Sequence, residues 1–238
     1  MDMDWEADGI LTIDSLEKSM RIGTTQLIPQ CLGDKEWHLD RMLGYIKQGQ
    51  DAGLDLLCFP EYELTGFMCE SPTIEQTQKL AEPADGPAAE KVRTALKGSN
   101  MAVGYGFIEN DDGALYNSYL VLDTAGQKHL YRKTHLVAFG KNLHEKNFVR
   151  PGQTLHTFNL NGIVFGVVIC FDGFHCESMR ELALQGAQII IWPLAGYGGG
   201  FLTTKTAQIR AFENNAFVVV SALTGNYSFL HQQQTSHF

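Results

Sequence analysis

The sequence has 238 residues, with 18 Lys and Arg against 27 Asp and Glu, so its formal net charge is −9. This length predicts one domain whose core needs no disulfide or metal ion, and 44% hydrophobic with 19% charged residues argues against disorder. The acidic balance argues against a nucleic-acid partner, and no apolar run approaches the ~18–20 residues that cross a bilayer.

The N-terminus and the cysteines both indicate a cytoplasmic protein. Residues 1–20 are acidic and weakly patterned, without the basic and then apolar stretches of a signal peptide. We therefore expect an N-terminal extension over 1–20 and a single domain over 21–238. Five scattered cysteines fit a reduced chain better than a disulfide framework. They are Cys31, Cys58, Cys69, Cys170 and Cys176.

Apolar, strand-like runs alternate with helix-like stretches from Arg21 onward. The predicted strands are Ile22–Ile28, Leu54–Phe59, Met101–Ile108, Leu115–Leu122, Gly162–Cys170, Gln188–Trp192 and Ala216–Ala222. The predicted helices are Asp34–Ala52, Ala88–Leu96, Glu177–Leu184 and Thr203–Asn214. This alternation predicts an α/β fold, and the turn-linked strands between residues 101 and 131 make the predicted sheet mixed.

The first strand end with a reactive group is that of Leu54–Phe59, which is followed by Pro60 and Glu61. Because proline cannot donate a hydrogen bond to a sheet, pairing should stop there and leave Glu61 at the sheet edge. Open α/β sheets bind ligands at the carboxyl ends of their strands, so Glu61 is a candidate acid or base. The alternative is a solvated glutamate with no chemical role.

The second segment contains Lys133 near the end of a strand-like run over 127–136. Strand alternation puts Leu130 and Arg132 on one face, and Tyr131 and Lys133 on the other. Lysine is rarely buried unless it is paired, so the alternative for Lys133 is an ordinary surface charge.

The third segment, Gly162–Cys170, is an almost unbroken apolar run, as in a central strand that is covered on both faces. A helix-like stretch begins near Glu177, so Cys170 lies at a strand-to-helix turn where backbone N–H groups can stabilise a thiolate. The alternative is a buried structural cysteine, because cysteine is among the most buried residue types.

Glu61, Lys133 and Cys170 form a coherent set for acyl transfer. A free thiol has a pKa of about 8.5 and is mostly protonated at neutral pH, so a carboxylate within reach can take its proton. A nearby ammonium lowers the pKa of the thiol and stabilises an oxyanion. This chemistry needs no cofactor. The eight histidines show no zinc-binding spacing, so we expect no metal site.

With these segments in this order, the sequence resembles the nitrilase superfamily of carbon–nitrogen hydrolases from about Arg21 to Gly225. Five segments carry the resemblance. They are Phe59-Pro60-Glu61 with Thr65-Gly66, Tyr131-Arg132-Lys133-Thr134-His135-Leu136, Glu145 with Phe148-Val149-Arg150-Pro151-Gly152, Ile169-Cys170-Phe171-Asp172 with Glu177, and Arg210-Ala211-Phe212-Glu213-Asn214.

The resemblance implies an α-β-β-α sandwich with a mixed sheet core, in which the sheets stack across a dimer interface into four layers. It implies an acyl-enzyme on Cys170 and general-base catalysis by Glu61. Lys133 and the backbone N–H of Phe171 would stabilise the oxyanion, and Glu145 would support Lys133. The resemblance also implies a homodimer or a higher homo-oligomer.

Substrate contacts are expected from four residues beside these segments, with core packing as the alternative for the aromatic ones. They are Tyr62, Phe171, Trp192 and Ala195. Where hydrolases of N-carbamoyl amino acids have an arginine for the substrate carboxylate, this sequence has Gly173. Phe171-Asp172 is closer to the amidase branch than to the Cys-Trp-Glu of nitrilases.

We therefore expect a thiol hydrolase that cleaves the non-peptide C–N bond of a small amide and releases ammonia or an amine. The alternatives are an N-carbamoyl amine or amino acid amidohydrolase, a nitrilase, and an inactive scaffold of the same fold. Only 13 residues follow Gly225, where family members continue through a hairpin and a tail, so we expect the usual C-terminal segment to be missing.

Overall fold

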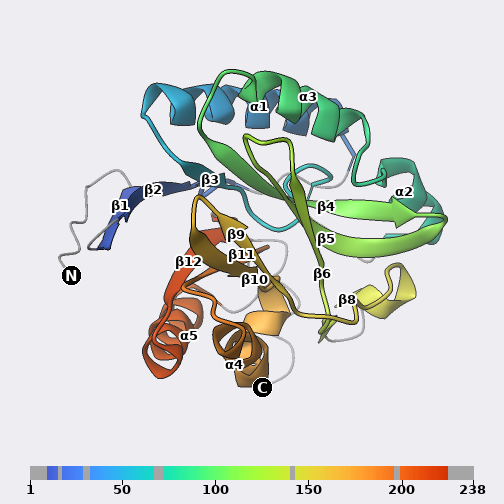
Figure 1. Ribbon diagram of the computed structural model, residues 1–238. Coiled ribbons are helices and arrows are strands. Elements are labelled where there is room, and N and C mark those ends of the chain that lie inside the picture. Colours follow the sequence, from blue (N-terminus) through green and yellow to red (C-terminus); the bar gives the residue numbers. More distant parts are fainter. Residues whose placement is uncertain are drawn as a thin grey trace.

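Two β-sheets pack face to face, and helices cover the outer face of each sheet, which makes four layers in the order α-β-β-α (Figure 1). This computed structural model describes residues 10–15, 18–28, 33–66, 72–139, 143–195 and 199–224. Both sheets combine parallel and antiparallel pairs, which confirms the predicted α/β class and the mixed sheet.

The first sheet has six strands in the order β1-β2-β3-β4-β5-β6. They are β1 (Ile10–Ser15), β2 (Lys18–Thr24), β3 (Leu56–Cys58), β4 (Ala102–Asp111), β5 (Ala114–Leu122) and β6 (Lys128–Arg132). β2, β3 and β4 are parallel, whereas β1 pairs antiparallel with β2, and β4, β5 and β6 form an antiparallel meander.

The second sheet has four strands in the order β12-β11-β10-β9. They are β9 (Thr157–Leu160), β10 (Ile163–Val167), β11 (Ile189–Leu194) and β12 (Phe217–Ala222). β10, β11 and β12 are parallel, and β9 pairs antiparallel with β10. The short strands β7 (Ala138–Phe139) and β8 (Leu143–His144) pair with each other beside this body.

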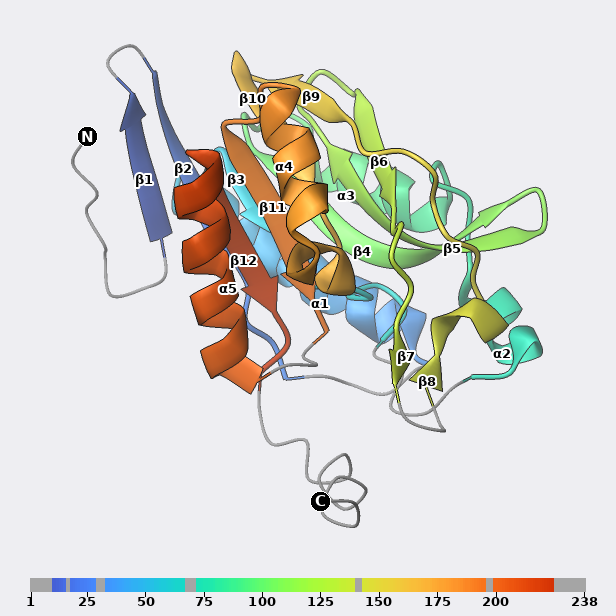
Figure 2. The same ribbon diagram turned by 90° about the horizontal axis from the view of Figure 1, so that it is seen from below.

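Helices α1 (Lys35–Asp51) and α3 (Pro87–Leu96) cover the first sheet, while α4 (Cys176–Leu184) and α5 (Gly199–Asn214) cover the second (Figure 2). Asp34 caps α1 by accepting a hydrogen bond from the backbone N–H of Trp37 at 3.0 Å. The short helix α2 (Ile74–Leu80) precedes α3. None of the helices in the described ranges combines the length and hydropathy of a membrane span.

Alternate residues of the central strands pack into different cores, since successive strand side chains point to opposite faces. In β3, Leu57 lies in the core beneath α1 and α3, while Leu56 lies in the core between the sheets. In β11, Ile191 faces the first sheet, whereas Ile190 and Trp192 pack against the layer of α4 and α5. Both sheets are thus covered on both faces, which explains the unbroken apolar runs of the sequence.

Several elements of the fold are missing from the sequence prediction. β1 and the start of β2 fall within residues 1–20, for which no strand is predicted, and they pair with each other at the edge of the first sheet. No helix is predicted over α2, although Thr73 and Gln76 have the spacing of a capping box and form one. β9 is also unpredicted, because only two of its four residues are apolar.

The expectation that the sheets stack across a dimer interface is corrected by the fold. Both sheets belong to one chain, and a single core that includes Ile22, Leu56, Phe165 and Ile191 lies between them. Stacking of the sheets therefore needs no second copy of the chain.

Candidate active site

Glu61 follows β3 in a turn that lies close against β4. The turn is held by hydrogen bonds from Leu64 N–H to Gly106 O at 3.0 Å and from Phe59 N–H to Gly104 O at 2.8 Å. A Cβ atom on Gly106 would lie 2.5 Å from the nitrogen of Tyr62 and 2.8 Å from the Cα of Glu61. Glycine is therefore the residue that lets the Glu61 turn approach the sheet.

This close approach predicts a large effect for Gly106→Ala. The added methyl group must push the Glu61 turn away, so we expect a loss of about 1–3 kcal/mol in unfolding free energy and roughly 10²-fold slower alkylation of Cys170. Urea unfolding and mass spectrometry with iodoacetamide measure the two effects. The matched control is Gly44→Ala on the exposed face of α1, where no atom lies within 4 Å. It should be stabilised by up to about 1 kcal/mol. Similar results for both variants would contradict the close approach.

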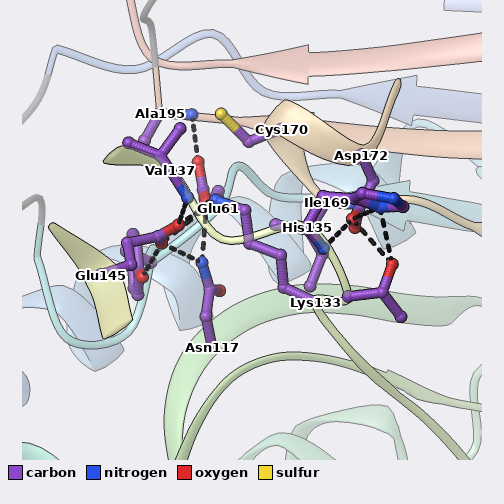
Figure 3. A network of polar contacts seen from close by, with 12 residues as sticks. Glu61, Asn117, Lys133, His135, Val137, Glu145, Ile169, Cys170, Asp172 and Ala195 are labelled. Carbon is purple, nitrogen blue, oxygen red and sulfur yellow. Dashed lines mark hydrogen bonds and ion pairs between the residues drawn. The ribbon is translucent and has the colours of Figure 1, made fainter. Parts of the chain in front are cut away.

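Glu61 is only 2% exposed, and both of its carboxylate oxygens are engaged (Figure 3). Oε1 accepts hydrogen bonds from Lys133 Nζ at 2.9 Å and from Asn117 Nδ2 at 2.8 Å. Oε2 accepts one from the backbone N–H of Ala195, which follows β11, at 2.8 Å. The carboxylate therefore joins the ends of both sheets, and the alternative of a solvated glutamate is wrong.

Lys133 follows β6, and Glu145 begins a single 3-10 turn over Glu145–Asn147. Lys133 Nζ lies 2.9 Å from Glu145 Oε2, and both side chains are buried. Glu145 also accepts hydrogen bonds from the Tyr62 hydroxyl at 2.7 Å and from the backbone N–H of Val137 at 2.6 Å. The ammonium of Lys133 is thus held between two buried carboxylates, so it is not the surface charge that was its alternative.

Cys170 follows β10 and opens a 3-10 turn over Cys170–Phe174 with φ of +46°, a conformation that is strained for any residue except glycine. Its carbonyl accepts a hydrogen bond from Trp192 Nε1 at 2.8 Å. Figure 3 shows the thiol on the side of the polar cluster where Glu61 meets Ala195. A cysteine on such a strained strand-to-helix turn has the geometry of a nucleophile.

Burial and the neighbouring carboxylates favour the protonated form of the Cys170 thiol. Burial raises the pKa of the Cys170 thiol well above its usual range, and Glu61 raises it further, whereas Lys133 lowers it. Lys133 thus lowers the pKa of the thiol as expected, but burial and the carboxylates outweigh this effect. Burial lowers the pKa of Lys133, but Glu145 and Glu61 reverse this and hold that pKa well above normal. Lys133 is thus a permanent cation, and the thiol needs a base.

Asp172 ties the Cys170 turn to the end of β6. Its buried carboxylate accepts hydrogen bonds from both segments (Figure 3). The donors are the backbone N–H groups of Ile169 at 2.9 Å and His135 at 2.7 Å, the hydroxyl groups of Tyr131 at 2.8 Å and Thr134 at 2.9 Å, and Nδ1 of His135 at 3.0 Å. The Asp172 carboxylate therefore links the Cys170 turn to the segment around Lys133.

The four residues expected to contact substrate have different surroundings. Tyr62 is buried against Glu145, and Ala195 is buried with its N–H on Glu61. Trp192 is wholly buried, and its Nε1 donates a hydrogen bond to the carbonyl of Cys170. Phe171, at 36% exposed, reaches solvent.

Asn117 is the polar site residue that the sequence analysis misses. It lies within β5 and hydrogen bonds to Glu61 at 2.8 Å and to Glu145 at 3.0 Å. The available signal is the pair of polar side chains, Asn117 and Ser118, within the apolar stretch of β5. Among the residues that the structure describes, His, Cys, Asp and Glu side chains form no group of three suited to a metal ion.

Comparison with known proteins gives this site a family. The sequence model of the carbon–nitrogen hydrolases matches residues 21–238. The chain belongs to the carbon–nitrogen hydrolase family. This confirms the resemblance to the nitrilase superfamily that the five sequence segments carry.

Two curated relatives of this carbon–nitrogen hydrolase are annotated with different reactions. A nitrilase of Pyrococcus abyssi is 32% identical over 213 residues, which cover 87% of this chain and 76% of the relative. An (R)-stereoselective amidase of Pseudomonas sp. is 34% identical over 192 residues, which cover 79% of this chain and 65% of the relative. Among solved structures, an amidase of the nitrilase superfamily from Nesterenkonia matches with a TM-score of 0.72, covering 87% of this chain and 77% of that chain. At 21% identity, this likeness shows the fold alone.

Proposed function

We propose that this carbon–nitrogen hydrolase is a cysteine-dependent amidase that hydrolyses a small amide. The observation that carries the proposal is the arrangement at Cys170: a protonated thiol on a strained turn beside a buried carboxylate, which in turn contacts a permanent ammonium. A general base and a fixed positive charge are the two components that thiol acyl transfer requires.

In the first half of the proposed reaction, Glu61 takes the proton of the Cys170 thiol, and the sulfur attacks the amide carbonyl carbon. Lys133 and the N–H of Phe171 stabilise the resulting oxyanion. Glu61 then gives the proton to the leaving nitrogen, so the C–N bond breaks, ammonia or an amine departs, and a thioester remains on Cys170.

In the second half, Glu61 takes a proton from water, and the hydroxide attacks the thioester. The C–S bond breaks, the carboxylic acid departs, and the proton on Glu61 returns to the sulfur. Glu145 takes no proton in this scheme; it keeps Lys133 charged and in place. Glu61, Lys133 and Cys170 are therefore the proposed catalytic residues.

The proposal of an amide substrate has support from the Nesterenkonia amidase, one structure of which shows covalent addition of the acetamide moiety of fluoroacetamide at its active-site cysteine. The surroundings of Gly173 argue against an N-carbamoyl amino acid. A Cβ there would lie 2.5 Å from Trp192 Nε1 and 2.7 Å from Trp192 Cζ2, so no side chain for a substrate carboxylate fits at this position. The 32% identity to a nitrilase makes nitrile hydrolysis the second candidate.

The test is ammonia release from small amides, nitriles and N-carbamoyl compounds, measured for the wild type, Cys170→Ala and Cys176→Ala. We expect release from amides that Cys170→Ala lowers by at least about 10³-fold. Cys176 is exposed and six residues further along the chain, so Cys176→Ala should keep wild-type activity. Full turnover by Cys170→Ala would disprove the mechanism, and release from nitriles alone would favour the second candidate.

We also propose that the chain forms homo-oligomers through α4 and α5. Large apolar side chains are exposed along α5 and at the end of α4, and exposed apolar surface of this kind is typical of an interface. They are Leu184 at 77%, Phe201 at 79%, Leu202 at 50%, Ile209 at 56% and Phe212 at 90%.

Sedimentation equilibrium at micromolar concentration should give at least a dimer for the wild type and a smaller species for Phe212→Asp. Ile74→Asp, which charges a 56% exposed apolar residue on α2, is the control and should leave the mass unchanged. A monomeric wild type would refute the proposed oligomer.

A further inference from the structure

Asn117 contacts all three charged members of the cluster, although it carries no charge. Its Nδ2 donates to Glu61 Oε1 at 2.8 Å and to Glu145 Oε1 at 3.0 Å (Figure 3). Its backbone carbonyl accepts the N–H of Lys133 at 2.9 Å. The residue is wholly buried in β5, on the first sheet.

This amide balances the charges of the site. Two carboxylates and one ammonium leave an excess negative charge, and like charges at close range favour protonation of one carboxylate. Asn117 supplies a further donor to the Oε1 atom of each glutamate, at the atoms that also face Lys133. Its two N–H groups therefore hold both carboxylates in one arrangement.

Asn117 also has an unsatisfied atom, which indicates that its position is not selected for stability alone. Within the described part of the chain, its buried Oδ1 has no hydrogen-bond partner. A buried acceptor without a partner costs free energy, and such costs concentrate at functional sites. Hydrogen bonds to the two carboxylates fix the orientation of the amide, and this orientation leaves its carbonyl oxygen without a partner.

We propose that Asn117 is a positioning residue for catalysis, which holds Glu61 and Glu145 in the geometry where Glu61 can accept the proton of Cys170. Asn117 acts through the two carboxylates and does not touch the substrate. The inference rests on the proposed function, in which Glu61 is the base.

The pH dependence of Cys170 reactivity distinguishes this role from a structural one. Burial raises the pKa of Glu61, while Lys133 and the hydrogen bond from Asn117 lower it. Loss of the Asn117 donor removes one of the lowering effects, so the pKa of Glu61 rises. A protonated Glu61 cannot take the thiol proton, so the acid limb of the pH profile moves to higher pH.

The experiment measures alkylation of Cys170 by iodoacetamide between pH 5 and pH 9 in Asn117→Asp and Asn117→Ala. Asn117→Asp keeps the shape but loses both donors, and Asn117→Ala removes the amide. We expect alkylation at pH 7 to slow by roughly 10²-fold, with the acid limb at higher pH than in the wild type.

Ser118→Ala is the matched control. Ser118 is the next residue of β5, is equally buried and donates to the carboxylate of Glu109 at 2.7 Å. Its loss should lower the unfolding free energy and leave the pH profile of Cys170 unchanged. An unchanged profile in folded Asn117→Ala, whether or not the rate falls, would overturn the positioning role.

If neither Asn117 variant folds, hydrogen exchange in the wild type tests the same contacts. The side-chain N–H protons of Asn117 should exchange far more slowly than those of the exposed Asn147. Equal exchange rates would overturn the inference. The proposed function is tested separately: amide turnover by Cys170→Ala would disprove it, whatever the Asn117 variants show.

Discussion

Lys133→Met should abolish amide turnover and lower the unfolding free energy by about 3–5 kcal/mol, because removal of one partner leaves buried charges uncompensated. Lys133 Nζ lies 2.9 Å from both Glu61 Oε1 and Glu145 Oε2, and its side chain is 2% exposed. Methionine fills a similar volume but supplies no charge and no donor. The oxyanion of the proposed reaction would also lose its fixed cation, which alone costs about 10²–10³-fold in rate.

The stability loss of Lys133→Met should depend on pH with a definite sign. Without Lys133, the pKa of Glu61, which burial already raises, rises further. A carboxylate with a raised pKa in the folded state stabilises the fold below its ordinary pKa of about 4.3 and loses that effect as the pH rises through the raised value. The deficit relative to the wild type should therefore be smaller at pH 5 than at pH 8.

Urea unfolding at the two pH values measures this difference. Lys128→Met is the control, since Lys128 is an exposed lysine of β6, the strand that Lys133 follows, and its loss should have a small effect at either pH. If Lys133→Met loses the same unfolding free energy at pH 5 and at pH 8, then Lys133 does not stabilise the fold by compensating ionised carboxylates.

Asp172→Asn should lower the unfolding free energy by about 3 kcal/mol and slow alkylation of Cys170 by roughly 10²-fold. Every group that contacts the Asp172 carboxylate is a donor, so the NH₂ group of asparagine would face further N–H and O–H groups. The Cys170 turn and the segment after Lys133 would then lose their common anchor.

The effect of Asp172→Asn should also vary with pH through His135. The hydrogen bond that His135 donates to the Asp172 carboxylate raises the pKa of His135. This stabilises the wild type below the ordinary histidine pKa of about 6.5, and the effect disappears as the pH rises through the raised value. The gap between wild type and variant should therefore be wider at pH 6 than at pH 9. Asp111→Asn is the control, because this exposed carboxylate contacts Arg132 outside the site. A pH-independent gap would show that Asp172 acts without His135.

The sequence alone determined the strands that carry the site and the chemistry of their ends. Glu61 and Cys170 each follow an apolar run, and unbroken apolar runs identify strands that are covered on both faces, whereas Lys133 follows a strand-like run of alternating faces. Strands and their ends can be predicted from the sequence because they depend on the periodicity of apolar residues and on proline or glycine close by in the chain. The order of the five matching segments added the family.

Tertiary structure decided the states of those groups and the partners that hold them. Glu61 contacts residues 56, 72 and 134 positions away along the chain, and no local pattern records such separations. The raised pKa of Cys170 follows from burial, which depends on the packing of one sheet on the other. Asn117 and Trp192 owe their contacts to segments that lie far away along the chain: Asn117 donates hydrogen bonds to Glu61 and Glu145, and Trp192 donates one to the carbonyl of Cys170. The residue types were thus legible in the sequence, whereas their charge states and contacts arose only when distant segments met in a low-dielectric interior.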